Sequence, residues 1–167
     1  GFSSEQDFER EINGMLEKIG QLFHVSRVYI FEDSPDGERC SNTFEWCGDN
    51  IIPQHAAQQN ICYRDLGTDY HANFDQQGVF LCQDVEALTP AQRKLMTGRR
   101  TLSVLQCAVT DNGRFVGFMG FDDCEIHRFW TQTQVEAISF VTKITFMLLI
   151  RGRAENAGNA PEKLRIE

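Results

Sequence analysis

The stretch that decides the fold runs from Asp111 to Trp130 and reads Asp-Asn-Gly, Arg-Phe-Val-Gly-Phe-Met-Gly-Phe-Asp-Asp-Cys, Glu-Ile-His, Arg-Phe-Trp. An Asn-Gly pair between two apolar runs is a strong signal for a β-hairpin. We therefore predict strands at 102–109 and 114–124. The second strand ends on the neighbouring carboxylates Asp122 and Asp123, which strand alternation sends to opposite faces. Because an acid/base pair must converge on one substrate, the stretch indicates a fold rather than a catalytic site.

Upstream of this hairpin, the sequence predicts a helix and a second hairpin. Apolar residues recur every three or four positions over residues 4–23, and Ser3 with Gln6 predicts a capping box at the start of that helix. Val25 to Phe31 is an apolar strand, and the strand Arg39 to Cys47 alternates. We expect one face of the alternating strand to carry Cys40, Asn42, Phe44 and Trp46.

The middle of the chain has weak periodicity. Residues 48–78, which we call the excursion, are polar with scattered aromatic residues and predict a long covering loop with one short helix near residues 54–59. A short strand follows at Val79–Cys82. Thr89 and Pro90 then open a predicted helix that ends near Gly98.

The last predicted helix spans residues 132–153, and Thr131 with Gln134 forms its capping box. It carries two apolar stripes, although a helix that covers a sheet needs only one. The second stripe is expected to meet another chain or the first helix. The order of elements predicts an α+β domain at residues 4–153, with about five or six antiparallel strands and both terminal helices on one face. The excursion then covers a pocket on the other face, and residues 154–167 are expected to be a linker to a C-terminal effector domain.

Composition narrows the function. The net charge is −8 without a basic cluster, which argues against binding to nucleic acid or to an anionic membrane surface. We find no run apolar and long enough to span a bilayer, and no signal peptide. The six cysteines lack C-x-x-C or zinc-finger spacing, so we expect a reduced cytoplasmic protein with buried thiols. The four histidines are scattered, so we expect no metal site.

Several side chains are candidates for contacting a ligand. Phe44 and Trp46 on one strand face offer a stacking surface, with packing in the core as the alternative. Gln106 is an amide in an apolar strand, so it needs a partner from a loop or a ligand. The full set that we predict to bind a ligand is Phe44, Trp46, Tyr63, Gln106, Phe121 and Asp123.

The chain resembles the GAF family of small-molecule sensory domains over residues 5–152. The resemblance depends on Asn42-Thr-Phe-Glu-Trp-Cys47, Ile52-Pro53, Gln59-Asn60-Ile61, Gly113 to Cys124 and Arg128-Phe-Trp130. It is strongest to the GAF domains that precede diguanylate cyclase (GGDEF), histidine kinase or phosphodiesterase outputs in bacterial signalling proteins. The resemblance implies a ligand pocket on one sheet face and terminal helices that pair in a homodimer and pass a signal to the next domain.

Some family features are absent. The chain lacks the Asn-Lys-Phe-Asp-Glu signature of cyclic-nucleotide-binding GAF domains and the Cys-His dipeptide that tethers a bilin. No cofactor is therefore identified, and the ligand is an unidentified small molecule.

The main functional hypothesis is a non-catalytic sensor module, without catalytic residues, that controls a diguanylate cyclase or kinase output. A thiol enzyme of the free methionine sulfoxide reductase type is an alternative, with Cys62 and Cys82 as candidate nucleophiles. A dimerisation module with a collapsed pocket is another.

Overall fold

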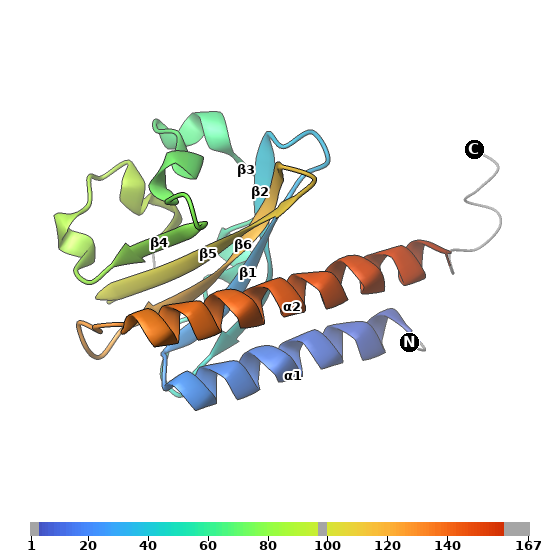
Figure 1. Ribbon diagram of the computed structural model, residues 1–167, viewed down its shortest axis with the longest axis horizontal. Coiled ribbons are helices and arrows are strands. Elements are labelled where there is room, and N and C mark those ends of the chain that lie inside the picture. The colour runs from blue at the N-terminus through green and yellow to red at the C-terminus, as the bar shows by residue number, and fades with distance from the viewer. Residues whose placement is uncertain (1–3, 97–99, 159–167) are drawn as a thin grey trace.

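A computed structural model describes residues 4–96 and 100–158, with two long helices lying side by side on one face of a single sheet (Figure 1). The helices are α1 (Glu5–Phe23) and α2 (Gln132–Gly158). The strands are β1 (Arg27–Asp33), β2 (Arg39–Cys47), β3 (Ile61–Cys62), β4 (Val79–Cys82), β5 (Ser103–Asp111) and β6 (Arg114–Asp123). They lie in the order β3-β2-β1-β6-β5-β4, and all neighbours are antiparallel. The predicted α+β class is confirmed.

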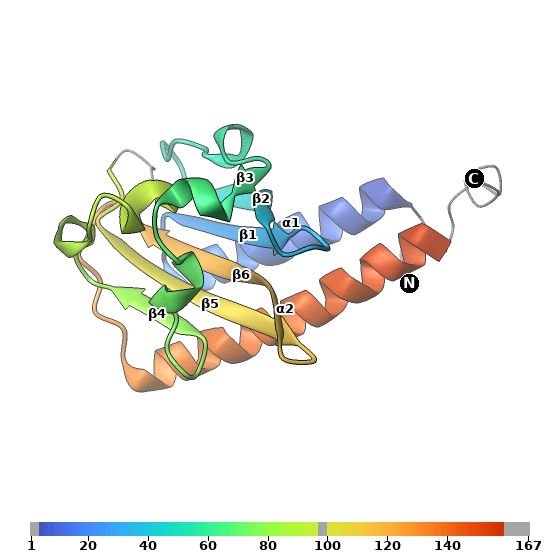
Figure 2. The same ribbon diagram turned by 90° about the horizontal axis from the view of Figure 1, so that it is seen from above.

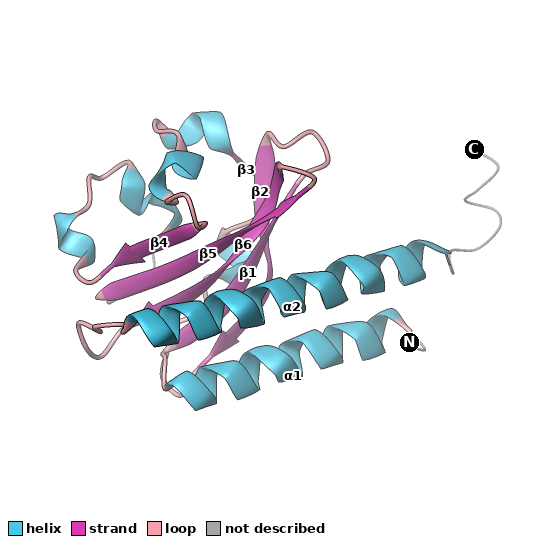
Figure 3. Cartoon of the chain, in the orientation of Figure 1, coloured by secondary structure: helices cyan, strands magenta, loops and turns pink. Residues whose placement is uncertain are grey.

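The two faces of the sheet are covered by different material (Figures 2 and 3). The terminal helices cover one face, where Ile12 and Leu16 of α1 and Phe146 of α2 pack with Val28 of β1. The other face is covered by the excursion and by residues 83–96 and 100–102 between β4 and β5, which we call the β4–β5 segment. These two segments contain five short 3₁₀ helices at His55–Ala57, Tyr63–Leu66, Tyr70–Asn73, Val85–Ala87 and Gln92–Leu95.

The β5–β6 hairpin forms where the Asn-Gly pair predicts it. Asn112 and Gly113 both have positive φ, 51° and 78°, as the two-residue turns of tight hairpins require. A glycine further along β6 also has a steric reason. A Cβ added at Gly120 would lie 2.1 Å from Cε2 of Tyr29, so only glycine lets that ring lie across the strand.

One register shift corrects the prediction for β2. Ile30 pairs with Phe44, whereas the next residue of β1, Phe31, pairs with Asn42, so Thr43 is an extra residue in a β-bulge. One inserted residue reverses the direction of the side chains beyond it. The expectation that Cys40, Asn42, Phe44 and Trp46 share a face is therefore wrong. Phe44 and Trp46 pack on the helix side, and Cys40 lies in the core on the opposite face.

The helix caps also follow from local sequence. Ser4 caps α1 by accepting a hydrogen bond from the Asp7 amide at 3.1 Å, whereas the predicted cap, Ser3, lies outside the described residues. At the start of α2, the amide of Thr131 donates to Gln134 Oε1 at 3.0 Å and the amide of Gln134 donates to Thr131 Oγ1 at 3.2 Å. The same reciprocal pair forms between Thr89 and Gln92, but only a 3₁₀ helix, Gln92–Leu95, follows it. The predicted end of that helix, near Gly98, lies outside the described residues.

Helix α2 is longer and more exposed than a helix that only covers a sheet. It continues to Gly158, beyond the predicted end at Arg153, so the first part of the predicted linker is helical; residues 159–167 lie outside the described part. Its outward side is apolar, with Phe140 65% and Met147 70% exposed. Contrary to the expectation from the sequence, the helix is long and apolar enough, by length and composition alone, to cross a membrane. Its other side packs on the sheet through Ile138, Phe146 and Leu149.

Candidate functional site

The sheet face opposite the helices carries a layer of aromatic side chains. Tyr70 of the excursion is fully buried and stacks on Phe118 of β6 at 5.7 Å between ring centroids. Phe74 contacts the same ring at 5.7 Å, and Phe31 stacks on it from β1 at 4.8 Å. The excursion is thus anchored on the centre of the sheet by aromatic packing.

A buried polar chain, which we call the Asp122 network, lies beside this layer. Tyr70 donates its hydroxyl hydrogen to Gln106 Oε1 at 2.7 Å, and Gln106 Nε2 donates to the Tyr29 hydroxyl at 3.0 Å. Tyr29 in turn donates to Asp122 Oδ1 at 2.9 Å, and Arg27 Nη1 donates to Asp122 Oδ2 at 2.5 Å. Every hydrogen bond in this network is donated in the direction of the Asp122 carboxylate. The negative charge of that carboxylate therefore orients the whole network.

Arg27 connects this network to both covering segments. Its Nη2 donates to the carbonyl oxygen of Ile52 in the excursion at 2.8 Å. Its Nη1 also lies 3.4 Å from Oγ1 of Thr101 in the β4–β5 segment. The network therefore joins β1, β5 and β6 to both segments that cover the sheet.

Burial perturbs the titration of these groups. Burial raises the pKa of Asp122 to about 6, against the opposing effect of Arg27 and the Tyr29 hydroxyl. Burial works to lower the pKa of Arg27, but the Asp122 carboxylate outweighs it, so the pKa lies above its ordinary value. Both charges are therefore present at neutral pH, as a pair with side chains 1% and 5% exposed. Burial also raises the pKa of Tyr29 well above its ordinary value, so its hydroxyl stays a donor.

A cationic cavity of about 500 Å³ opens beside Thr101, in the β4–β5 segment. We call it the basic groove. Its lining residues are Val85, Glu86, Pro90, Arg93, Lys94, Met96, Arg100, Thr101 and Leu102. Arg93 pairs with Glu86 at 3.2 Å, and Lys94 donates to a backbone carbonyl. The groove thus combines an apolar floor with three cationic side chains in a chain of net charge −8.

The structure divides the predicted ligand-contacting residues between the two sheet faces. Gln106 is fully buried in the Asp122 network, where its partners are the side-chain hydroxyls of Tyr70 in the excursion and Tyr29 in β1. Tyr63 also lies on that face and donates to Asp33 at 2.6 Å. Phe44, Trp46 and Phe121 pack beneath the helices instead.

The two neighbouring aspartates do lie on opposite faces, and Asp122, rather than the predicted ligand contact Asp123, lies on the face that the excursion covers. Asp122 joins the network, whereas Asp123 accepts from Arg128 Nε at 2.8 Å. Arg128 also donates to the carbonyl of His24 at 2.6 Å, so that pair ties the end of α1 to the segment before α2. The alternation of side chains along β6 determines which aspartate joins the network. Asp122 lies on the same face of β6 as Phe118 and Gly120, whereas Asp123 lies on the other face.

Sequence reasoning missed Arg27, Tyr29, Tyr70 and Asp122 as members of one network. The available signal was Arg27, a cation inside an otherwise apolar strand, since such a charge is buried only with a partner. The partner itself lies 95 residues away in sequence and could not be assigned.

The surroundings of Cys40, Cys47, Cys82 and Cys107 do not favour nucleophilic chemistry. Burial raises the pKa of Cys40 to about 12 and that of Cys47 to about 11, whereas a reactive thiol needs a lowered pKa. Burial also raises the pKa of Cys82 and Cys107. Within residues 4–96 and 100–158, no three His, Cys, Asp or Glu side chains are grouped to hold a metal ion.

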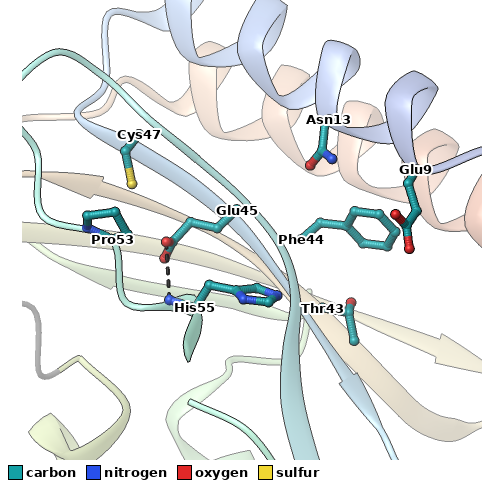
Figure 4. Close-up of a pocket in the computed structure, with 8 residues that line it drawn as sticks. All are labelled: Glu9, Asn13, Thr43, Phe44, Glu45, Cys47, Pro53 and His55. Atoms are coloured by element: carbon teal, nitrogen blue, oxygen red, sulfur yellow. Dashed lines mark hydrogen bonds between the residues drawn. The ribbon is translucent and has the colours of Figure 1, made fainter. Parts of the chain in front are cut away.

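A second cavity, of about 460 Å³, lies between α1 and the outer side of β2 (Figure 4). We call it the edge groove. Glu9 and Asn13 of α1 form one wall, Pro53 and His55 form the other, and β2 contributes Thr43, Phe44, Glu45 and Cys47. The Glu45 carboxylate accepts from the backbone amides of Gln54 and His55 at 2.9 and 3.2 Å, which fixes the second wall.

Comparison with known proteins gives relatives in signalling. No model of a protein family matches the chain. The methanogenesis regulatory histidine kinase FilI of Methanothrix harundinacea (strain 6Ac) is 25% identical over 162 residues, covering 89% of this chain. The match spans only 18% of the length of that kinase.

Solved structures match almost the whole chain. The GAF3 domain of Slr1393 from Synechocystis sp. PCC6803 aligns with a TM-score of 0.71 and 13% identity, over 92% of this chain and 99% of that domain. The GAF domain of PixJ from Thermosynechococcus elongatus aligns at 0.70 and 12% identity, over 93% and 92%. The phycocyanobilin-bound GAF domain of a cyanobacterial phytochrome aligns at 0.68 and 16% identity, over 92% and 87%. The sheet order, the paired terminal helices and the covering segments of this chain are therefore those of the GAF fold.

Proposed function

We propose that this chain is a non-catalytic sensory domain of a signalling protein, and that a small molecule bound beside the Asp122 network changes the position of the terminal helices. The observation that carries the proposal is the network itself. Its central residues belong to β1, β5 and β6, and Arg27 and Tyr70 extend it to the covering segments. A ligand that moves those segments acts directly on the strands beneath α1 and α2.

The basic groove is the proposed entry for the ligand. Thr101 lines this groove and also lies within hydrogen-bond distance of Arg27. Three cations over an apolar floor favour an anion with an apolar tail. Gln106 and Tyr63 remain proposed ligand contacts, because they lie on the sheet face that the excursion covers. Phe44, Trp46 and Phe121 are no longer proposed, because they pack beneath the helices.

Thermal-shift measurements on the purified chain test this proposal, with octanoate and benzoate as probes and inorganic phosphate as a probe without a tail. A ligand at 100 times its Kd contributes about 2.7 kcal/mol, so the melting temperature rises by roughly 5–10 °C. Arg100→Glu is expected to remove the shift, and Arg10→Glu, an exposed arginine on α1, is the matched control. If neither carboxylate raises the melting temperature, or if both variants respond alike, the proposed site is wrong.

We also propose that the outward stripe of α2 pairs with a second copy of this chain. Phe140, Ile144 and Met147 recur at spacings of four and three and are 65%, 39% and 70% exposed. Exposed apolar stripes of this kind mark contact surfaces. Such a pair carries a shift of α2 into whatever follows it along the chain.

Light scattering after size-exclusion chromatography tests the dimer. The unmodified chain is expected to run as a dimer, and Met147→Glu as a monomer. Ile52→Glu, which also places a charge at an exposed apolar position, is expected to leave the dimer intact. A monomeric unmodified chain contradicts this part of the proposal.

The proposed output is a histidine kinase, since the relative FilI is one. A diguanylate cyclase remains the second proposed output, and a cytoplasmic position of this domain remains part of the proposal. Autophosphorylation of the full-length protein with and without the Arg100→Glu substitution tests the kinase. Equal activity across ligand concentrations in the unmodified protein contradicts sensing.

A further inference from the structure

We infer that the edge groove binds an extended, basic peptide segment by adding it to the sheet as a strand beside β2. The groove lies at the opposite side of the sheet from β4, and the inference does not depend on the proposed small molecule. Its floor is a strand edge, its walls are fixed, and its charge is negative.

The strand edge is open along its second half. Among the strands of the described residues, β3 alone lies outside β2, and it pairs with Arg39 and Cys40 in the first half of β2. The amide of Gly48 donates to the carbonyl of Ser26, so the alternating bonds to β1 come from Trp46 and Phe44. The backbone groups of Glu45 and Cys47 therefore point away from β1.

These outward groups have no partner. Among residues 4–96 and 100–158, no hydrogen bond reaches the backbone N–H or C=O of Glu45 or Cys47 from outside the β1–β2 pair. Two residues at this spacing present the donor and acceptor pattern that a further antiparallel strand completes.

The two walls hold an incoming strand in line. In Figure 4, Glu9 and Asn13 project from α1 toward β2, while Pro53 and His55 lie on the other side of the strand. The Glu45 carboxylate is bonded to the amides of Gln54 and His55, so this wall does not collapse onto the edge. The cavity of about 460 Å³ lies between them.

Charge decides the kind of partner. Glu9 is exposed and makes no ion pair with another described residue, and the Glu45 carboxylate adds a second negative charge to the groove. A lysine or arginine on the incoming strand therefore gains a partner at Glu9, and an acidic segment is repelled. A second copy of β2 would bring its own carboxylates to the same place, so edge-to-edge pairing between copies is disfavoured.

Fluorescence anisotropy with a labelled, capped peptide Lys-Thr-Val-Thr-Lys-Thr-Val tests the inference. The matched peptide has N-methyl groups on alternate amides, which keep its charge and side chains but block strand pairing. The N-methyl peptide is expected to bind at least about 10-fold more weakly, because it loses its backbone hydrogen bonds.

The charge requirement is tested with Glu9→Lys and the control Glu11→Lys, which makes the same change on another side of α1. Glu9→Lys is expected to raise the Kd of the unmodified peptide about 10-fold, whereas Glu11→Lys is expected to change that Kd by less than about 2-fold. Binding of the peptide is also expected to slow hydrogen exchange at the amides of Glu45 and Cys47.

Three results overturn the inference. The first is no binding of the unmodified peptide at millimolar concentration. The second is equal binding of the N-methyl peptide, which reduces the interaction to charge alone. The third is protection of the Glu45 and Cys47 amides in the free protein that grows with protein concentration, which assigns the edge to a second copy.

Discussion

Replacing Arg27 by Met is the sharpest test of the Asp122 network. Arg27 and Asp122 have side chains 1% and 5% exposed, and Arg27 makes further contacts to the Ile52 carbonyl and Thr101. Removing one member of a buried ion pair leaves the other charge without compensation and costs about 3–5 kcal/mol. A domain is stabilised by only about 5–15 kcal/mol, so the loss is large and readily measured.

The loss of stability in Arg27→Met is expected to depend on pH, whereas a loss caused by poorer packing alone would not. The pKa of Asp122 is already raised by burial, and Arg27 is the strongest influence that lowers it, so Arg27→Met raises it further. A carboxyl whose pKa is higher in the folded than in the unfolded state holds its proton longer when folded. Its contribution to stability is therefore lost as pH rises and regained as pH falls. The variant is expected to lose less stability at pH 5 than at pH 7.

Urea unfolding followed by the fluorescence of Trp46 and Trp130 measures both quantities. Arg151→Met is the control, because Arg151 pairs with Glu155 on the surface of α2 with 72% of its side chain exposed, and such pairs contribute less than about 0.5 kcal/mol. Adding Asp122→Asn to Arg27→Met is expected to recover part of the loss and to remove its pH dependence. The reasoning is refuted if Arg27→Met costs no more than the control, or costs the same at both pH values.

Other predictions concern packing and thiol reactivity. Gly120→Ala is expected to destabilise the fold by about 1–3 kcal/mol, because its Cβ would meet Tyr29, whereas Gly14→Ala, with open space around it in α1, stabilises by about 0.5–1 kcal/mol. Thermal unfolding compares them, and equal effects contradict the steric explanation. Cys40, 2% exposed with a pKa raised by burial to about 12, is expected to resist iodoacetamide at pH 8 until the chain unfolds. Peptide mass spectrometry checks this, and rapid labelling of the folded protein would count against it.

The order of elements could be predicted because local rules determine it. The Asn112-Gly113 turn, the Thr131–Gln134 capping box and the apolar spacing of α1 all act between residues a few positions apart. The wrong prediction for the side-chain directions in β2 has an equally specific cause. Thr43 adds one residue to β2 as a bulge, and no local sequence pattern predicts it.

The site was much harder to predict than the fold. Gln106 was identified from the sequence because a buried amide needs a partner, but the partner, Tyr70, was unknown until the excursion was folded over the sheet. Trp46 illustrates the opposite case. A large aromatic residue on a strand gives the same sequence pattern whether it lines a ligand pocket or packs beneath a helix, so its position could not be predicted.

The sequence by itself determined an antiparallel sheet between two terminal helices, because periodicity and turn chemistry are local properties of the chain. Only the tertiary structure decided which face each side chain occupies and which charges meet. Arg27 and Asp122 lie far apart in sequence, and their pairing depends on the register of β1 against β6. The open edge of β2 likewise could not be predicted from the sequence. Whether a strand edge is free depends on which other segments pack beside it in the folded protein.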